Sequence, residues 1–395
     1  MAVVTSPSGP AANARPFLHG SELAAIGRVL AAGQYGHGAE TEAFEAELAA
    51  YLGVDDVVAV ATGTAALHLA LLVAGVGPGD DVVVPSLTFC ASVQAILATG
   101  AHPRFADVDP DTLCATADHI EAALSPATRV VMPVLYGGRA VDLTTITARL
   151  ADRDIAVVED AAHAFGSQHR GHRVGATGAL TCFSFDAIKA LTCGDGGAIV
   201  PRTPTEAGWL RRARLLGIGS PRERRVATVS YAVHEPGFRY HLSTLHAAIG
   251  RVQLARFADI AARRKQLWHQ YATALTDIPI AALVDLDVVN TVPFNCVVRV
   301  PAPARDAVHA QLHAAGIQAG VHYPPNHLQP AFTRWSRPLP NTEDIAGEIL
   351  SLPFHPDLTD DDISHVTATL AAALENELAA PDGTTPVSAG ERGGR

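Results

Sequence analysis

The stretch FSFDAIKALTCGDGGAIV, residues 183–200, joins two short apolar runs through a glycine-rich turn that contains Lys189. Similar Val- and Ile-rich runs recur along the first half of the chain, most of them roughly 20 to 26 residues apart, with helix-like segments between them. Continuous apolar runs that alternate with helices predict a mostly parallel sheet with helices on both faces, and therefore an α/β fold. The expected strands are residues 57–61, 81–85, 103–108, 129–134, 155–159, 180–185 and 197–201.

The pattern changes in the last third of the chain. Residues 243–275 are expected to form one long helix with Ser243 as its N-cap, and residues 294–301 a strand. Two further helices are expected over residues 305–316 and 361–378. We therefore predict a large domain over residues 15–255, a smaller α+β domain over residues 256–376, and disordered tails at residues 1–14 and 377–395.

The composition argues against several classes of protein. The 395-residue chain is 48% hydrophobic and has a formal net charge of −11, so nucleic acid is not expected as its main partner. No apolar run is long enough for a membrane span, and residues 1–16 lack the regions of a signal peptide. The five cysteines have no paired spacing and are expected to be reduced thiols in a cytoplasmic protein. No cluster of ligands predicts a metal site.

Lys189 is unusual because 29 residues of the chain are Lys or Arg and only two of them, Lys189 and Lys265, are lysines. Unlike a guanidinium group, a lysine amine can lose its proton and condense with an aldehyde to form a Schiff base. The apolar flanks of Lys189 and the turn that follows it favour such a chemical role. An ordinary surface lysine is the alternative that the local sequence leaves open.

Several other candidate residues stand just after an expected strand, and ligands gather at the carboxyl ends of strands in open parallel sheets. Asp160 follows residues 155–159 and could hold a protonated pyridine nitrogen or cap a helix. His163, one helical turn later, could bond to a cofactor ring or be a buried core histidine. Phe89 could stack on a flat ring or pack in the core.

The segment VATGTAALHLALLVAG, residues 60–75, combines a strand end, a tight turn at Gly63 and Thr64, and an apolar helix. Free backbone N–H groups at such a helix N-terminus form a cradle for phosphate. Ser184 is a second candidate phosphate ligand, with a half-buried strand serine as the alternative. The segment matches neither a Walker motif nor a dinucleotide-binding motif, so alone it is a weak indication.

Together these stretches resemble the DegT/StrS family of sugar aminotransferases, which are fold-type-I enzymes that depend on pyridoxal phosphate (PLP). The most specific part of the resemblance is the combination of Asp160, Ser184 and Lys189. It implies a large domain, with a mostly parallel sheet between helices, and a smaller α+β C-terminal domain. The matching stretches follow the family order over about residues 16–372: GTAALHLAL, VVVPSLTF, FADVDPDTL, VEDAAHAFGS, FSFDAIKALTCGDGGAIV, PGFRYHLSTLHAAIGRVQL, GVHYPPNHLQPAF and SLPFHPDLTDDD.

The resemblance also implies a role for each matching residue. Lys189 would carry the cofactor as a Schiff base and then shuttle a proton, and Asp160 would pair with the pyridine nitrogen. His163 would lie near the ring hydroxyl, and Phe89 would stack on the ring. The phosphate would be bound by Gly63, Thr64, Ala65 and Ser184.

Fold type I further implies a homodimer with shared active sites, in which GFRYHLS, residues 237–243, reaches the cofactor phosphate of the partner. Arg239 and His241 stand where the family more often has Asn or Lys, and Arg or Asn, and are expected to be polar cofactor ligands. The turn CGDGG also departs from the usual SGEGG or TGEGG, with Asp195 in place of Glu.

Two segments are expected on the substrate side. The segment LRRARLLGIGSPRERR, residues 210–225, holds six arginines, of which Arg222 and Arg224 could grip a diphosphate. A solvated basic face is the alternative for this segment. The proline-rich loop GVHYPPNHLQP, residues 320–330, resembles the substrate-side loop of the family. Its expected substrate ligands are His322, Tyr323 and His327.

The resemblance predicts transfer of an amino group from glutamate or glutamine to a keto sugar, which we expect to be a nucleotide-activated 4-keto or 3-keto deoxysugar. Aminocyclitol aminotransferases and aminohydroxybenzoate-type synthases are the alternatives within the family. Lys189 argues against the sugar 3-dehydratase branch, which has histidine in place of the cofactor lysine. A non-catalytic regulator with the same fold is a remote alternative, which Lys189 and Asp160 oppose.

Overall fold

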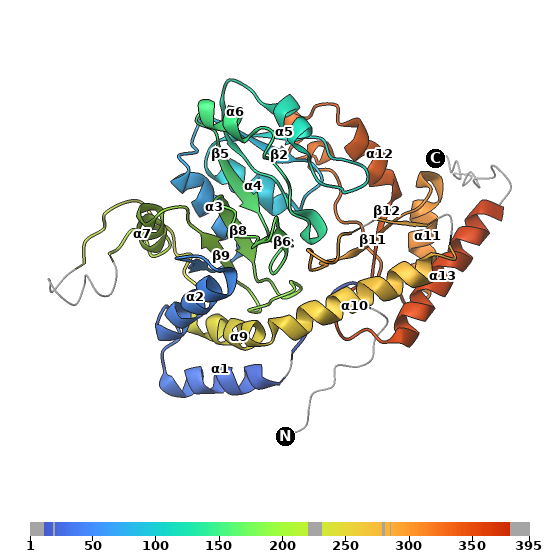
Figure 1. Ribbon diagram of the computed structural model, residues 1–395, viewed down its shortest axis with the longest axis horizontal. Helices are drawn as coiled ribbons and strands as arrows, with labels where there is room; N and C mark the ends of the chain where they lie inside the picture. The colour runs from blue at the N-terminus through green and yellow to red at the C-terminus, as the bar shows by residue number, and fades with distance from the viewer. Residues whose placement is uncertain (1–11, 19, 220–230, 279–280, 285, 380–395) are drawn as a thin grey trace, which may run out of the picture.

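The computed structural model describes residues 12–18, 20–219, 231–278, 281–284 and 286–379 (Figure 1). The strands of its large sheet are β1 (Val58–Val60), β2 (Asp81–Pro85), β3 (His102–Ala106), β4 (Thr128–Val131), β5 (Ala156–Asp160), β8 (Leu180–Ser184) and β9 (Gly197–Val200). A short hairpin is formed by β6 (Gln168–His169) and β7 (His172–Arg173), and η1 (Tyr136–Gly138) is a 3-10 turn. The helices of this part are α1 (Ser21–Ala32), α2 (Ala39–Leu52), α3 (Gly63–Val73), α4 (Cys90–Ala98), α5 (Ala117–Ala123), α6 (Thr147–Asp152), α7 (Pro204–Ala213) and α9 (Thr244–Ala255).

The strands of the large sheet lie in the order β1-β9-β8-β5-β4-β2-β3. The four pairings from β8 to β3 are parallel, whereas β9 runs antiparallel to both β8 and β1. The prediction of a mostly parallel sheet in an α/β fold is therefore confirmed. The direction of β9 is reversed because residues 185–196 return the chain directly, without a crossover helix.

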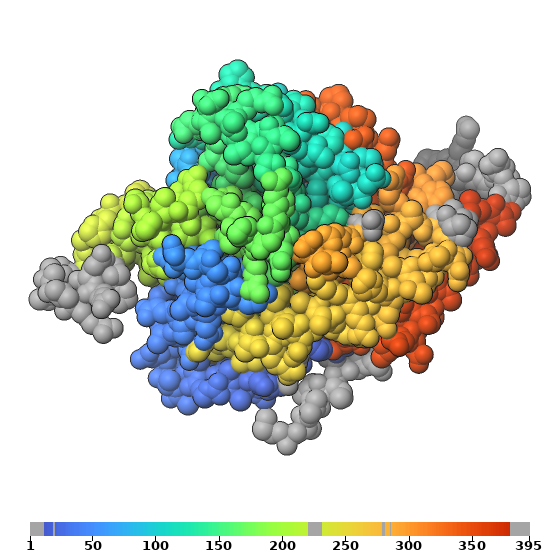
Figure 2. Space-filling view, viewed as in Figure 1, coloured from blue at the N-terminus to red at the C-terminus, as the bar shows by residue number. Residues whose placement is uncertain are grey.

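Side chains on both faces of this sheet are buried. In β1, Val58 and Val60 belong to one core cluster with residues of α3 and α7, whereas Ala59 belongs to another cluster with Phe183. The alternation arises because successive side chains of a strand point to opposite faces. Figure 2 shows the blue surface of α1 and α2 beside the yellow surface of α9, and Figure 1 shows these helices below the sheet.

The C-terminal part of the chain has a core of its own. Its antiparallel sheet consists of β10 (Ala282–Leu283), β11 (Cys296–Arg299) and β12 (Ile349–Leu352). Its helices lie at the right of Figure 1 and are α10 (Phe257–Leu275), α11 (Ala302–Ala314), α12 (Pro340–Glu348) and α13 (Asp360–Ala379), with the 3-10 turns η2 (Asn326–Leu328) and η3 (Thr333–Trp335). Apolar side chains from Leu267 to Leu374 form its core cluster. No helix in the described part of the chain is long and apolar enough to cross a membrane.

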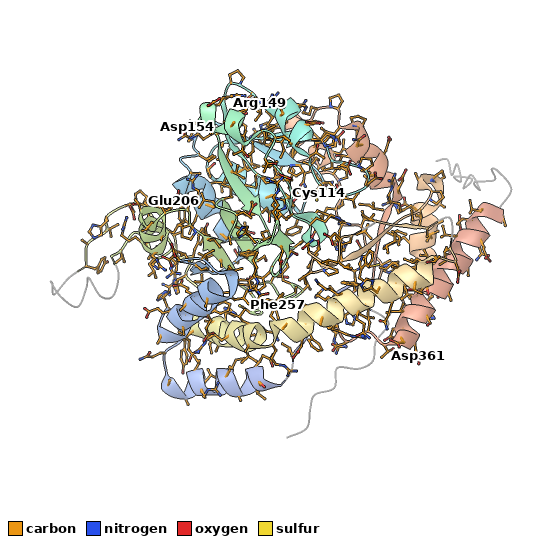
Figure 3. All side chains as sticks on the ribbon, in the orientation of Figure 1. Cys114, Arg149, Asp154, Glu206, Phe257 and Asp361 are labelled. Carbon is orange, nitrogen blue, oxygen red and sulfur yellow. The ribbon has the colours of Figure 1, made fainter. Side chains whose placement is uncertain are left out.

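The expected single helix over residues 243–275 is two helices, so this prediction is wrong. Arg256 ends α9 because its backbone angles, φ −115° and ψ 11°, are not those of a helix. Phe257 (labelled in Figure 3) begins α10 and packs against Gly166, where a Cβ atom would lie 2.3 Å from its ring. Ser243 caps α9 as expected, because its hydroxyl accepts the N–H of His246.

Parts of the two predicted tails are ordered, although residues 1–11 and 380–395 lie outside the described residues. Asn13 donates from Nδ2 to the carbonyl of Ser351 and accepts the N–H of Phe354, both at 2.9 Å. At the other end, α13 continues past residue 376 to Ala379. Glu377 is held there by Gln311, whose Nε2 lies 2.7 Å from its carboxylate.

Candidate active site

A cavity of about 380 Å³ opens where the carboxyl ends of β5 and β8 meet the N-terminus of α3. Open parallel sheets bind ligands at this edge, and the volume suits a small molecule. The cavity brings together most of the residues that the sequence indicates. They are Gly63, Thr64, Phe89, Asp160, His163, Ser184, Lys189, His322 and Tyr323.

The carboxylate of Asp160 stands at the end of β5, and the residue is only 5% exposed. Its Oδ2 accepts a hydrogen bond from Ser92 Oγ at 2.7 Å, and its Oδ1 accepts one from the N–H of Ala162 at 3.2 Å. Burial raises the pKa of Asp160, and the two hydrogen bonds and the charge of Lys189 partly oppose that effect. A cationic partner in the cavity would stabilise the ionised carboxylate.

Lys189 lies in the turn after β8, where its N–H donates to the carbonyl of Asp186 at 3.0 Å. The Nζ atom lies 4.6 Å from the centre of the Phe294 ring. Burial lowers the pKa of Lys189 to about 8, although the charges of Asp160 and Asp186 act in the opposite direction. An amine with this pKa is partly deprotonated near neutral pH, which makes it available as a nucleophile.

The buried imidazole of His163 is oriented by two hydrogen bonds. Nδ1 lies 3.3 Å from the N–H of Gly137 and must accept its hydrogen, so Nε2 carries the proton of the neutral ring. Nε2 therefore donates to the hydroxyl of Tyr323, 3.1 Å away. Burial lowers the pKa of His163 well below its usual value, and the charges of Lys189 and His322 add to this effect.

This arrangement fixes the direction of the Tyr323 hydroxyl. Because its oxygen accepts the hydrogen of His163, its own proton can be donated to a molecule in the cavity. Burial raises the pKa of Tyr323, so the hydroxyl keeps its proton across the physiological range. Tyr323 can therefore act as a hydrogen-bond donor, not as a base.

The N-terminus of α3 forms one wall of the cavity. Thr62 caps the helix, and its Oγ1 accepts the N–H of Ala65 at 2.9 Å. The amides of Gly63 and Thr64 begin the helix and have no partner within it, as expected for a phosphate cradle. A Cβ atom at residue 63 would lie 2.7 Å from Cβ of Ser184, so only glycine allows this close approach.

Four expected cofactor or substrate ligands do not line the cavity. Ala65 is buried, and its amide is already bonded to Thr62. Arg239 is exposed, and His241 forms a β-bridge with Val60. The fourth is His327, which is fully buried. Arg222 and Arg224 lie outside the described residues.

His327 holds the proline-rich loop against the large sheet. Its Nδ1 lies 2.7 Å from Ser86 Oγ, directly after β2, and its Nε2 lies 3.3 Å from Oε1 of Glu343. The neighbouring Asn326 donates from Nδ2 to the carbonyl of Thr88 at 2.6 Å. These bonds fix the loop that carries Tyr323 into the cavity, which is a structural task and not contact with a substrate.

Sequence reasoning missed two residues at the site. Ser92, whose hydroxyl bonds to Asp160, stands three residues after Phe89. This spacing of about one helical turn was the only feature of the sequence that could have pointed to it. Phe294 stacks on the ring of His163, with 3.9 Å between ring centres and 16° between planes. Nothing in the local sequence marks Phe294, because its neighbours in the site are distant in the chain.

The groups in the cavity fit PLP. They include an amine with a lowered pKa, a buried carboxylate that forms no ion pair with another described residue, and a cradle for phosphate. The ring of Phe89 is 56% exposed, which is unusual for a large apolar side chain and offers a flat ligand a face to cover. Among the described residues, no three His, Cys, Asp or Glu side chains gather as a metal site would require.

Comparisons with known proteins agree with this chemistry. The chain matches the model of the DegT/DnrJ/EryC1/StrS aminotransferase family over residues 17–371. The aminotransferase TlmJ from Streptoalloteichus hindustanus is 36% identical, with 93% of this chain and 100% of that chain covered and a TM-score of 0.87. The sugar aminotransferase CalS13 from Micromonospora echinospora is 32% identical, with 92% and 99% covered and a TM-score of 0.85.

A third similar structure, Spr1654 from Streptococcus pneumoniae, has been solved in its PLP and PMP forms. In the PLP form it is 26% identical to this chain, with 93% of this chain and 99% of that chain covered and a TM-score of 0.86. The match to the family model extends over most of the chain and includes every cavity residue described above. The chain therefore belongs to the DegT/DnrJ/EryC1/StrS aminotransferase family and is a PLP-dependent aminotransferase of fold type I.

Proposed function

We propose that this aminotransferase takes an amino group from glutamate or glutamine and transfers it to a keto sugar, a nucleotide-activated 4-keto or 3-keto deoxysugar. The observation that carries the proposal is the convergence of Lys189, Asp160 and the α3 cradle in one cavity. The likeness to CalS13, which is described as a sugar aminotransferase, supports a sugar as the acceptor.

When bound, PLP supplies an electron-accepting ring that stabilises negative charge at the carbon bearing the amino group. Asp160 would keep the ring nitrogen protonated, and Phe89 would cover one face of the ring. The amides that begin α3 and the hydroxyl of Ser184 would bind the phosphate. Lys189 would use Nζ to take a proton from the carbon that bears the transferred amino group, and would return it on the cofactor side of that nitrogen.

The acceptor would be bound mainly by the proline-rich loop. His322 and Tyr323 both line the cavity, and Tyr323 presents a hydroxyl proton to it. We assign these two residues to the keto sugar, and we assign Arg222 and Arg224 to its diphosphate.

The charge of the cavity supports a homodimer with shared sites. No arginine is among the described residues that line the cavity, whereas PLP and a nucleotide sugar both bring phosphate groups. Arg239 is exposed and does not reach the cavity of its own chain. We propose that Arg239 and His241 complete the site of the partner subunit.

We also place the protein in the cytoplasm, where its five free cysteines would remain reduced.

The proposal is tested in two steps. The purified protein with PLP is first mixed with glutamate or glutamine, and both the visible absorption of the cofactor and the formation of the 2-oxo acid are followed. The aminated protein is then offered nucleotide-linked 4-keto and 3-keto deoxysugars and a keto cyclitol, and products are identified by mass spectrometry. Amination of a nucleotide sugar supports the proposal. Amination of the cyclitol alone, or no 2-oxo acid in the first step, contradicts it.

A further inference from the structure

Arg264, on α10, is a buried cation. It is 2% exposed, and no carboxylate among the described residues forms an ion pair with it. Its Nη1 donates to the carbonyls of Phe294 at 3.1 Å and Pro293 at 3.4 Å, and its Nε has no partner. Burial lowers the pKa of Arg264 to about 10, so the guanidinium still carries its charge at neutral pH. Burying such a charge is costly, so its retention requires a reason.

The carbonyls that Arg264 holds belong to the segment that packs behind the active site. The Phe294 ring stacks on the imidazole of His163, with 3.9 Å between the ring centres. The centre of the Phe294 ring also lies 4.6 Å from Nζ of Lys189. Phe294 is 8% exposed, so the ring has little freedom to move. A helix of the C-terminal core thereby fixes one aromatic ring against two residues of the cofactor site.

We propose that Arg264 is a positioning residue for Lys189. It fixes Phe294 beside the lysine amine, and its unpaired positive charge disfavours the protonated amine. Arginine suits this task because it keeps its charge when buried and can donate to two carbonyls. The proposal goes beyond the assigned reaction, because it concerns the state of Lys189 before any donor or acceptor binds.

Other groups around Lys189 also influence the protonation of its amine. Burial disfavours the protonated amine most strongly, Asp160 at the end of β5 and Asp186 in the same turn favour it, and Arg264 adds a smaller effect in the direction of burial. The remaining titratable groups that respond to the lysine charge are His163, after β5, and His322, in the proline-rich loop. Both imidazoles have a pKa lowered first by burial, so Arg264 is the cation that opposes protonation of Lys189 near neutral pH.

The test measures the reactivity of the Lys189 amine in the full-length protein without PLP. Trace acetylation with acetic anhydride is followed by mass spectrometry from pH 6 to 10, against an added lysine peptide. The chain is well suited to this, because Lys265 is its only other lysine, so the acetylated peptide that contains Lys189 is easily told apart, and the added lysine peptide is the reference. Replacing Arg264 with Gln or Met should lower the acetylation rate of Lys189 at pH 7.5 by about threefold, because loss of a nearby positive charge favours the protonated amine.

Arg263→Gln is the matched control. Arg263 is the preceding residue of α10, but its guanidinium donates to the carbonyls of Pro356 and Leu358. Its replacement should leave the acetylation of Lys189 unchanged. An unchanged rate in both Arg264 variants, or an equal fall in Arg263→Gln, would overturn the proposal. If neither Arg264 variant folds while Arg263→Gln does, the residue is structural and the proposal also fails. None of these outcomes depends on the identity of the amino acceptor.

Discussion

Ser92 Oγ lies 2.7 Å from Oδ2 of Asp160 and donates its proton to that carboxylate. The same hydroxyl lies 2.9 Å from Oγ1 of Thr88, so a short chain of hydroxyl groups leads from the strand end after β2 to Asp160. Hydrogen bonds that reach a charged acceptor are about twice as strong as neutral ones. Ser92 therefore lowers the pKa of a carboxylate that burial alone would raise further.

Replacing Ser92 with alanine should raise the pKa of Asp160. The ionised carboxylate is needed to hold the ring nitrogen, so the acid limb of the pH–rate profile for the glutamate half-reaction should move to higher pH. A lost bond to a charged group is worth about 1.5–3 kcal/mol, so the acid limb should move up by about one to two pH units, while the rate on the plateau above it stays near that of the wild type. Stopped-flow absorption of the cofactor measures this rate.

Thr99→Ala is the control for the Ser92 variant. Thr99 stands at the other end of α4, and its hydroxyl donates to the carbonyl of Ile96 at 2.7 Å, away from the cavity. It should lose some stability and keep the pH profile of the wild type. A uniform loss of rate at all pH values in Ser92→Ala would show that Ser92 shapes the site without tuning Asp160.

Replacing Lys189 with methionine should stabilise the protein without PLP. The pKa of Lys189 is about 8 in the folded protein and 10.5 in the unfolded chain. Between pH 8 and pH 10.5 the folded state therefore binds fewer protons than the unfolded state. The cost of burying the charged amine is therefore complete below pH 8 and disappears as pH rises through 10.5. Lys189→Met should gain up to about 3 kcal/mol at pH 7, seen as a melting temperature a few degrees higher, and nothing near pH 11.

Lys265→Met serves as the comparison for this measurement. Lys265 is more exposed, and its Nζ donates to the carbonyl of Val289 at 2.8 Å. Little change in its melting temperature is expected at either pH. If Lys189→Met melts below the wild type at pH 7, the amine is a stabilising group in the fold, and the lowered pKa is not supported.

Replacing Tyr323 with phenylalanine should separate the two half-reactions. The ring would be kept, but the proton that Tyr323 offers to the cavity would be lost, together with the acceptor for His163 Nε2. We expect the rate with the keto acceptor to fall about ten- to a hundredfold, while the glutamate half-reaction changes less than about threefold. Tyr271→Phe, which removes a buried hydroxyl bonded to the carbonyl of Pro353, is the control. Equal losses in both half-reactions would instead assign Tyr323 to the cofactor.

The parts of the site that follow strand ends could be predicted from the sequence. Asp160 ends β5 and Lys189 follows β8, so the rule that ligands gather at strand ends was enough to group them. Phe294 could not be found in this way, because it reaches Lys189 from 105 positions away, through the packing of the C-terminal core. His327 was misjudged for the same reason: its partners Ser86 and Glu343 are distant in the chain, and their contacts are set by tertiary packing.

The fold shows a similar division. The apolar runs predicted all seven strands of the large sheet, because continuous burial on both faces leaves a plain signal. The break at Arg256 was missed because helix propensity stays high across it, and the packing of Phe257 against Gly166 joins residues that are distant in the chain. Tertiary contacts override local preference at such points.

The proposed sharing of active sites predicts that two inactive variants can restore one another. Lys189→Ala and Arg239→Ala chains, with different tags, are co-expressed, and the heterodimer is isolated by both tags. One of its two sites would contain Lys189 from one chain and Arg239 from the other, so we expect about half of the wild-type activity, against little in either homodimer. Two observations would contradict the shared site: a heterodimer as inactive as its parents, or an Arg239→Ala homodimer with full activity. Restored activity would show that Arg239, which does not line the cavity of its own chain, acts in that of its partner.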